Sequence, residues 1–374
     1  MQCVTPMFYY YKLGDKKHGK VVARNEVLST LNYDPNYIRH SLEKKNALET
    51  DHKYIQIPCQ KCWACQLRYS GEWATRIMKE AEKYDNNWFI TLTYGDHSLP
   101  IAEKSEWDQY DLDPEDPFGE RIKTHQVIEN DGTWTHGTLY PPDMDTFLNS
   151  LRKHFRDKGH KGVKYFYCGE YGSETKRPHY HIIIMNCPLN PLEFYKPHVD
   201  KNFKAHWHSH ELEHLWADDF EGKRIPKGII DVAELEWSCA AYVARYCTKK
   251  LNTESDKTDY LKEGRYPEFI RMSKGIGMDY VNENLESIYK NDEIIMRTVK
   301  GNLGSIKPPK AYDRILKEKN PKLYEKIKRS REKAKERADE ILKSLSDTTD
   351  LMKLEQNARK LEQKMSMLPR PGEW

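Results

Sequence analysis

The sequence predicts an α+β fold in which helices flank a central antiparallel sheet. Three short runs rich in β-branched and aromatic residues indicate strands, at 88–94, 163–168 and 180–185. Two segments with apolar residues at helical spacing, 72–83 and 143–154, indicate helices. Because the predicted helices alternate with the predicted strands along the chain, we expect the helices to pack against the sheet.

Each predicted helix presents an apolar stripe. The stripes contain Trp73, Ile77 and Ala81 in the first helix and Phe147, Leu148 and Leu151 in the second. Two prolines, Pro141 and Pro142, precede the second helix and are typical of a helix start, so that we expect Asp143 or Asp145 to cap it.

The composition indicates a folded protein without a membrane span. Of 374 residues, 38% are hydrophobic, and 24 Tyr, 10 Phe and 9 Trp supply the large apolar surface that disordered chains lack. The chain contains no apolar run long enough to cross a bilayer, and its first residues lack the basic and apolar regions of a signal peptide. We therefore expect a cytosolic protein whose eight cysteines are thiols or metal ligands rather than disulfides.

The charge is unevenly distributed along the chain. Residues 307–374 hold 19 Lys and Arg against 12 Asp and Glu, a surplus of +7, so that the total of +3 leaves −4 for residues 1–306. A cluster of glycines and prolines lies at the change, namely Gly301, Gly304, Pro308 and Pro309. We expect a catalytic domain at 1–306, with a cysteine-rich segment at 1–70 and an inserted loop at about 103–140.

The remaining residues, 307–374, are expected to form a basic, mostly helical C-terminal extension. Residues 322–345 are rich in Lys, Glu, Arg and Ala and contain no Gly or Pro. A helix of this kind is either a solvated helix of mixed charge or a contact for a phosphate backbone or a protein partner.

Two histidines with one residue between them stand on a predicted strand. Successive side chains of a strand point to opposite faces, so that His179 and His181 share a face and Tyr180 points the other way. Two imidazoles on one strand can bind a single metal ion, and Glu170, at the end of the preceding predicted strand, can add a carboxylate. The spacing by itself is a weak signal, because it recurs in the segment 206–210.

A pair of tyrosines stands at helical spacing near residue 245. Tyr242 and Tyr246 lie one turn apart on one face of a helix, and Lys249 returns to that face. The same tyrosine spacing occurs at 33/37 and 167/171, and tyrosines at helical spacing are more often core residues than nucleophiles.

In chain order these motifs resemble those of the HUH endonucleases that initiate rolling-circle replication, and more closely those of the replication initiation proteins of gokushovirus-type microviruses. The resemblance covers about residues 1–330. Its motifs are Cys3, CQKCWAC at 59–65, EWA at 72–74, FITLTY at 89–94, CGEYG at 168–172, RPHYH at 177–181, YVARYCTKK at 242–250, Met272-Ser273, Gly275-Ile276-Gly277 and 309–313. The segment between Met272-Ser273 and the Gly-Ile-Gly motif is shorter here than is usual in the family.

The resemblance implies that a tyrosine hydroxyl attacks a phosphodiester of the single-stranded DNA origin. The products are a 5′-phosphotyrosyl link and a free 3′-OH for the polymerase, and two tyrosines allow a second exchange that later rejoins the strand. The expected partners are origin DNA and the host helicase and polymerase, in the cytoplasm of the host bacterium. The expected site residues are Tyr242, Tyr246 and Lys249 for catalysis, His179, His181 and Glu170 for Mg²⁺ or Mn²⁺, and Arg177, Arg245 and Lys250 for DNA.

Three further cysteines, Cys59, Cys62 and Cys65, follow one another at intervals of three. A regular helix or strand cannot turn all three toward one ion, so that the spacing predicts a loop folded around a structural Zn²⁺. The early Cys3 that the resemblance includes is the natural fourth ligand. The alternative is a set of reduced thiols in a tight loop.

Two other functional classes compete with the nuclease hypothesis. The segment His210–His214 matches H-E-x-x-H, the zinc-protease motif in which both histidines bind the metal and the glutamate acts as base. A non-enzymatic DNA-binding module would instead use the cysteines as a zinc knuckle and the basic tail to bind phosphates. Within the nuclease class, a plasmid or transposon initiator of the HUH superfamily is the alternative.

Overall fold

The computed structural model describes residues 7–12, 15–22, 52–58, 63–102, 122–123, 137–172, 175–200, 204–249, 260, 265–297 and 303–344. The described chain is α+β with a large antiparallel sheet, as the sequence predicts. Contacts divide it into two compact units, one of residues 1–69 with 320–370 and one of residues 70–319 with 371–374. The expected boundary at residues 306/307 stays a prediction.

The second unit is built on a seven-stranded sheet in which every paired neighbour is antiparallel. Its order is β14 (Phe269–Met272), β7 (Lys164–Tyr171), β8 (Pro178–Met185), β4 (Asn87–Thr93), β13 (Ile230–Glu234), β10 (Ala205–Ser209) and β9 (Phe194–Val199). The three strands predicted from the sequence are the central strands β4, β7 and β8, which confirms them. These strands carry near-continuous buried residues because helices cover both faces of the sheet.

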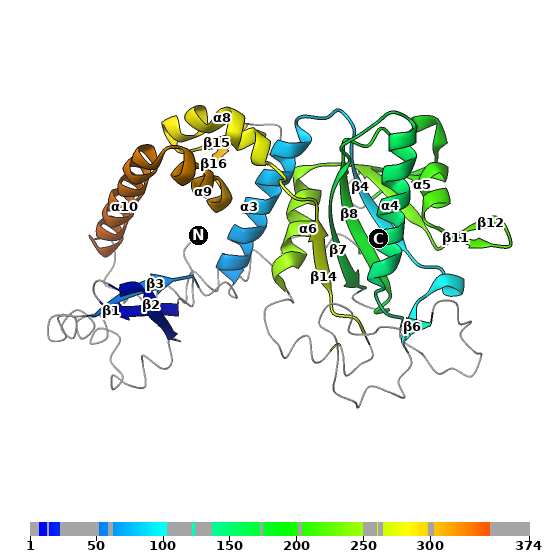
Figure 1. The fold of residues 1–374 in the computed structure, drawn as a ribbon, viewed down its shortest axis with the longest axis horizontal. Coiled ribbons are helices and arrows are strands. Elements are labelled where there is room, and N and C mark those ends of the chain that lie inside the picture. The colour runs from blue at the N-terminus through cyan, green and yellow to red at the C-terminus, as the bar shows by residue number, and fades with distance from the viewer. Residues whose placement is uncertain are drawn as a thin grey trace. The chain divides into compact units, whose positions relative to one another are not determined.

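Helices cover the two faces of this sheet (Figure 1). On one face lies α4 (Pro141–Asp157), whose predicted stripe of Phe147, Leu148 and Leu151 is buried. On the other lie α6 (Trp237–Lys249) and α3 (Trp63–Ala81), with Ile77 and Ala81 of α3 buried against the sheet.

The expected cap of α4 is wrong. The helix begins at Pro141, after Tyr140 as N-cap residue, and no side chain of that cap residue bonds to the first backbone amides. Proline at the first helical position needs no amide partner, so that Asp143 stands inside the first turn. There it is buried and accepts a hydrogen bond from the Tyr94 hydroxyl.

The Gly-Ile-Gly motif serves the packing of α3 against the start of α8 (Met278–Asn291). Gly277 has a φ of 71°, and a side chain there would lie 2.8 Å from the Arg76 carbonyl oxygen. Its amide donates to the buried Glu80 carboxylate at 2.7 Å, which also accepts from Lys164 Nζ at 2.7 Å. Only glycine permits both the left-handed backbone and the close approach.

Smaller elements complete the second unit. They are η1 (Asp96–Ser98), β5 (Ile101–Ala102), β6 (Ile122–Lys123), η4 (Pro191–Glu193), α5 (His210–Leu215), β11 (Ala217–Phe220), β12 (Lys223–Pro226), β15 (Ile294–Arg297), β16 (Leu303–Ile306) and α9 (Lys310–Lys319). Apart from β5 and β6, the expected inserted loop lies almost wholly outside the described residues before 137.

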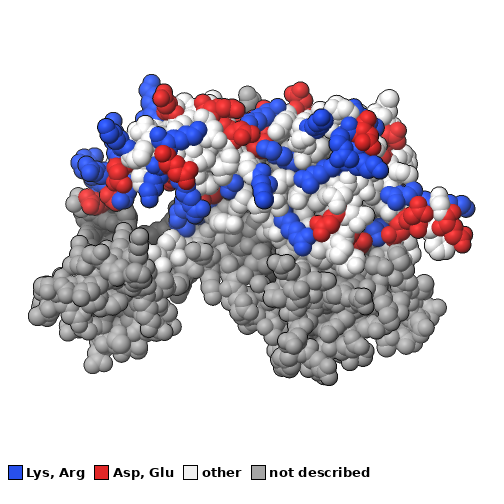
Figure 2. Space-filling model, in the orientation of Figure 1, with Lys and Arg blue, Asp and Glu red and all other residues white. Residues whose placement is uncertain are grey.

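The first unit contains a three-stranded antiparallel sheet and a long helix. The strands are β1 (Met7–Lys12), β2 (Asp15–Val22) and β3 (His52–Ile57), in the order β2-β1-β3, and the helix is α10 (Pro321–Ser344). The helix confirms the prediction for residues 322–345 to within a residue at each end. Figure 2 shows Lys and Arg interleaved with Asp and Glu over the described surface of this face. No helix of the described residues is both long and apolar enough to span a membrane.

Candidate functional site

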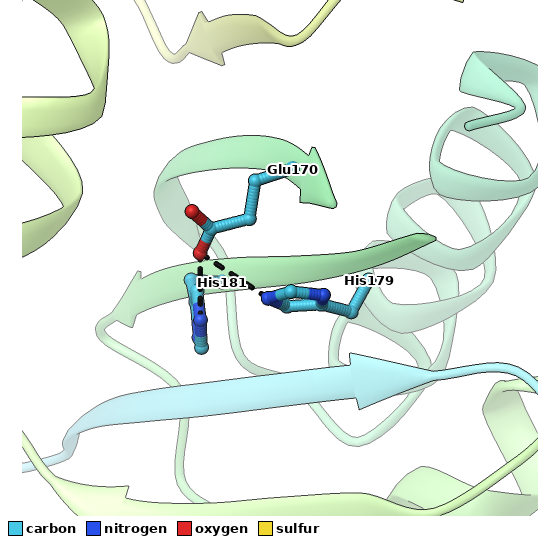
Figure 3. Close-up of side chains that lie close together, drawn as sticks. All are labelled: Glu170, His179 and His181. Carbon is cyan, nitrogen blue, oxygen red and sulfur yellow. Dashed lines mark ion pairs between the residues drawn. The ribbon is translucent and has the colours of Figure 1, made fainter. Parts of the chain in front are cut away.

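Glu170, His179 and His181 lie together on the face of the sheet that α6 covers. Strands β7 and β8 pair with Glu170 opposite His179, which brings the carboxylate to both imidazoles. Glu170 Oε1 lies 2.8 Å from His181 Nε2 and 3.3 Å from His179 Nε2 (Figure 3). One donor atom from each residue lies within 4.8 Å of the others, close enough for all three to bind one ion.

Hydrogen bonds to the opposite ring nitrogens orient the two imidazoles. His179 Nδ1 lies 3.2 Å from the Arg177 carbonyl oxygen, which can only accept, so that Nδ1 carries a proton and Nε2 of the neutral ring turns its lone pair to Glu170. His181 Nδ1 bonds to Thr91 Oγ1 at 2.9 Å. Metal-binding histidines are commonly oriented in this way through the nitrogen that does not bind the metal.

An unsatisfied buried atom tests whether a cation fits here. His181 is 1% exposed, and its Nε2 has no hydrogen-bond partner among the described residues although it lies beside the carboxylate. Buried polar atoms are rarely left in this state without a ligand or water. Two imidazoles and one carboxylate are a mixed nitrogen and oxygen donor set that suits Mn²⁺ and also accommodates Mg²⁺.

Burial and mutual charge shift the pKa values of the three groups. Burial opposes the ionised form of Glu170, but the charge of His181 and hydrogen bonds from both histidines outweigh it and hold the pKa well below its ordinary value. Burial lowers the pKa of His181, whereas Glu170 more than offsets burial at His179 and raises its pKa. An ionised carboxylate beside a neutral His181 is the protonation state that a bound cation requires.

Tyr242 of α6 reaches the same carboxylate. Its hydroxyl donates to Glu170 Oε1 at 3.0 Å, and its ring lies 5.2 Å from the His181 ring, edge to face. Tyr242 is 3% exposed. The structure thus places one of the two predicted nucleophiles directly on the histidine and glutamate cluster.

The other residues predicted on this helix are described in part. Tyr246 and Lys249 lie in α6, which confirms the helix, but their side chains and the whole of Lys250 are outside the described residues. The Arg245 guanidinium lies 6.0 Å from the Tyr242 ring centroid.

Arg177, predicted to bind DNA, is engaged within the protein. Its guanidinium donates two hydrogen bonds to the Tyr94 carbonyl oxygen, at 3.1 and 2.9 Å, and forms an ion pair with Asp96 at 2.6 Å. These bonds fix the approach to the strand that carries His179 and His181. A contact with DNA stays a prediction for this residue.

The predicted zinc loop lies largely outside the described residues, which include none of Cys3, Cys59 and Cys62. Cys65 lies within α3, where it is buried, so that the expectation of a loop extending to Cys65 is wrong. The helix starts at Trp63, two residues before it. Zinc binding by the four cysteines stays a prediction.

The H-E-x-x-H segment does not have the geometry of a protease. It forms the short helix α5, and its Glu211 accepts hydrogen bonds from Lys158 at 2.6 Å and His154 at 2.8 Å, next to each other at the end of α4. His210 stacks on the Tyr195 ring at 4.0 Å. Because the carboxylate that would act as base is bound to these two side chains, the protease alternative is wrong.

Sequence reasoning missed two features of this face. Thr91, which holds His181, was visible only as part of a buried strand, and its role depends on the pairing of β4 with β8. A second cluster, formed by His198, His206 and Asp231, was dismissed as a chance histidine spacing at 206–210. The signal available for it was that spacing followed by an aspartate on a later strand.

Known proteins match this chain over most of its length. A family model that describes replication-associated proteins of the ORF2 type matches residues 87–251. The chain is 33% identical to the replication-associated protein ORF2 of Spiroplasma virus 4, over 99% of this chain and 98% of that protein. It is 26% identical to the replication-associated protein VP4 of Bdellovibrio phage phiMH2K, over 72% and 70% of the two chains.

A third relative is the replication-associated protein ORF4 of Chlamydia phage 1, which is 24% identical over 64% of this chain and 49% of its own. No solved structure matches the chain. The region matched by the family model contains Glu170, His179, His181 and Tyr242.

Proposed function

Because the chain belongs to the family of replication-associated proteins of gokushovirus-type phages, we propose that it initiates rolling-circle replication. In this proposal it is an endonuclease of the HUH superfamily that nicks single-stranded origin DNA with a tyrosine and keeps the 5′ end covalently bound. Its partners are the origin DNA and the replication enzymes of the host bacterium, in whose cytoplasm it acts.

The observation that carries the proposal is the hydrogen bond from Tyr242 to Glu170. A helix supplies the nucleophile, and two strands supply the carboxylate and the imidazoles, so that all three kinds of group converge on one point. A purely structural tyrosine and glutamate would not need two more imidazoles facing the same oxygen, one of them with an unpaired Nε2. The convergence favours phosphodiester chemistry over a binding role.

The protein side chains have separate tasks in this mechanism. Glu170, His179 and His181 hold Mg²⁺ or Mn²⁺, which supplies positive charge to a non-bridging phosphate oxygen. The Tyr242 hydroxyl leaves Glu170 and turns to the phosphorus, the bond from its oxygen to phosphorus forms, and the bond to the 3′-oxygen breaks. Holding the tyrosine within a few ångströms of the phosphate replaces a bimolecular encounter by an intramolecular step.

Tyr246 provides the second exchange. The two tyrosines of α6 are one turn apart, so that the helix can bring either hydroxyl to the phosphate in turn. A phosphotyrosyl diester retains the energy of the broken bond, which allows the later rejoining of the strand. Lys249 and Lys250 follow in the sequence and stabilise the charge that develops on phosphate and phenolate.

Covalent capture of DNA tests the proposal. The full chain is incubated with Mn²⁺ and single-stranded oligonucleotides that tile the phage genome, and adducts are separated on denaturing gels. We expect a DNA-bound species whose linkage mass spectrometry maps to Tyr242 or Tyr246. Either single Tyr-to-Phe variant is expected to retain single cleavage, whereas the double variant forms no adduct; Tyr280→Phe, a tyrosine on α8, is the matched control.

The same gels separate the alternatives. A non-enzymatic DNA-binding module with a zinc knuckle would bind the oligonucleotides and yield no adduct with any of them. An adduct from the double variant, mapped to another residue, would contradict the two-tyrosine mechanism. A plasmid or transposon initiator of the same superfamily is disfavoured because the matched relatives are proteins of phages and viruses.

A further inference from the structure

A second group of potential metal ligands lies on the same face of the sheet as His181. It consists of His198 on β9, His206 on β10 and Asp231 on β13, and one donor atom from each lies within 4.8 Å of the others. Asp231 pairs across the sheet with Thr91, which in turn pairs with His181. The two groups therefore stand on different strands and share no residue.

The strand register builds this second group. His206 lies directly opposite His198 on one side and opposite Ala233 on the other. Asp231 is two residues from Ala233, so that it shares the face of the two histidines. Three strands thus bring one side chain each to a single point.

The ligand atoms face one another at short distances. His206 Nδ1 lies 2.6 Å from Asp231 Oδ2, and His198 Nε2 lies 3.1 Å from Asp231 Oδ1. His198 Nδ1 donates to the Lys196 carbonyl oxygen at 3.2 Å, so that its Nε2 is a lone pair in the neutral ring. Asp231 Oδ1 is buried and accepts no hydrogen bond from the described residues.

A lone pair and a carboxylate oxygen repel each other unless a positive charge lies between them. The same arrangement occurs in the first cluster, where the Arg177 carbonyl holds His179 Nδ1 and turns Nε2 toward Glu170. At His206 a buried carboxylate, Asp200, lies beside the other ring nitrogen, with Oδ2 4.0 Å from Nε2. Carboxylates in this position orient histidines that bind metals.

We propose that His198, His206 and Asp231 bind a Zn²⁺ ion with a structural role. Two imidazoles and one carboxylate suit zinc, which takes a water as its fourth ligand. The ion would hold the edge of the sheet, because β10 pairs with β13 through only two residue pairs and its pairing with β9 shifts register between His206 and His208. It joins β9, β10 and β13 where backbone pairing is weakest.

Cobalt titration of the full chain tests this site. Co²⁺ replaces zinc, and its visible absorption reports bound ions. Metal-free protein carrying His179→Ala and His181→Ala, which removes the first cluster, is expected to bind about one more equivalent than the same protein with His198→Ala. Asp231→Asn should cause the same loss, whereas the control His210→Ala, a histidine of the neighbouring helix α5 whose side chain is 60% exposed, should not.

Hydrogen exchange gives a second readout that does not depend on activity. Zinc should slow exchange of the β9 and β10 amides in the parent protein and leave them unchanged in His198→Ala. The His198 side chain is 45% exposed, so that this variant is expected to fold even where Asp231→Asn does not.

Three results would overturn the proposal. They are equal cobalt binding with and without His198, an equal loss in the His210→Ala control, and cobalt bound only with the near-ultraviolet bands of thiolate ligands, which would assign the ion to the cysteines. Each of these outcomes leaves the proposed DNA nicking untouched, because the second site shares no residue with the first.

Discussion

The two faces of the seven-stranded sheet each bury a polar cluster, and the clusters are bonded differently. Under α4, the Tyr94 hydroxyl donates to Asp143 at 2.8 Å and lies 3.2 Å from the Tyr180 hydroxyl, and Lys227 forms an ion pair with Asp143 at 3.1 Å. Under α6, His181 keeps an unpaired Nε2 beside Glu170. The first cluster satisfies its members internally, whereas the second leaves a bonding position open.

This difference indicates which face is built for stability and which for function. A buried polar network that is satisfied rigidifies the core, and removal of one member leaves its partners unpaired. A network with an open position is destabilising by itself and is retained where a ligand completes it. Substitutions on the α4 face should therefore reduce stability first, and those on the α6 face should reduce activity first.

The largest expected effect is the loss of nicking in His181→Ala or His179→Ala. Removal of a ligand to the cation should slow cleavage by about 1,000-fold or more, because the cation contributes several kcal/mol to transition-state stabilisation. Affinity for single-stranded DNA should fall only a few-fold, since contacts with the backbone carry it. Nicking at the parental rate in saturating Mn²⁺ would show that the site lies elsewhere.

The next effect is on stability and concerns the other face. Asp143→Ala leaves the buried Lys227 with a single carboxylate partner and removes the acceptor of the Tyr94 hydroxyl. The free energy of unfolding, measured by urea denaturation, should fall by about 3–5 kcal/mol. The control is Asp145→Ala, an exposed residue on the same helix that pairs with Arg271, which should change it by less than about 0.5 kcal/mol.

A smaller effect is expected for Thr91→Val, which keeps the shape of the side chain and deletes the hydroxyl that bonds to His181 Nδ1. The Mn²⁺ concentration for half-maximal nicking should rise by about 10-fold to 100-fold, as is usual when a residue that orients a metal ligand is lost. Thr91→Ser restores the hydroxyl and should restore the titration. If valine and serine behave alike, the threonine only packs.

The smallest effect concerns pH and lies beside α4. Burial opposes the charge of Glu211, but hydrogen bonds from Lys158 and His154 outweigh it and lower its pKa below the ordinary 4.5. A lowered pKa in the folded state gives stability that is present above pH 4.5 and is lost as the pH falls below it. Thermal melts should show Glu211→Gln less stable than the parent at pH 7, with the difference shrinking toward pH 3; a constant difference would mean that the ion pairs are not its source.

Much of the fold follows from local patterns in the sequence. The strand runs, the stripes of α3 and α4 and the alternation of His179, Tyr180 and His181 depend only on residue spacing, and the structure has all of them. The helix bearing Tyr242 and Tyr246 is of the same kind. The cap of α4 was mispredicted because a proline start and an aspartate cap are both compatible with that stretch, and the buried partners of Asp143 decide between them.

The convergence of side chains from distant segments was decided by the tertiary structure alone. The sequence offered Glu170 and the two histidines as candidate ligands, but the pairing of β7 with β8 sets the distances between them. The hydroxyl of Thr91 and the second group at His198, His206 and Asp231 depend on pairings between strands far apart in the chain. Cross-strand register arises from long-range packing, and a shift of one residue would turn each of these side chains to the opposite face.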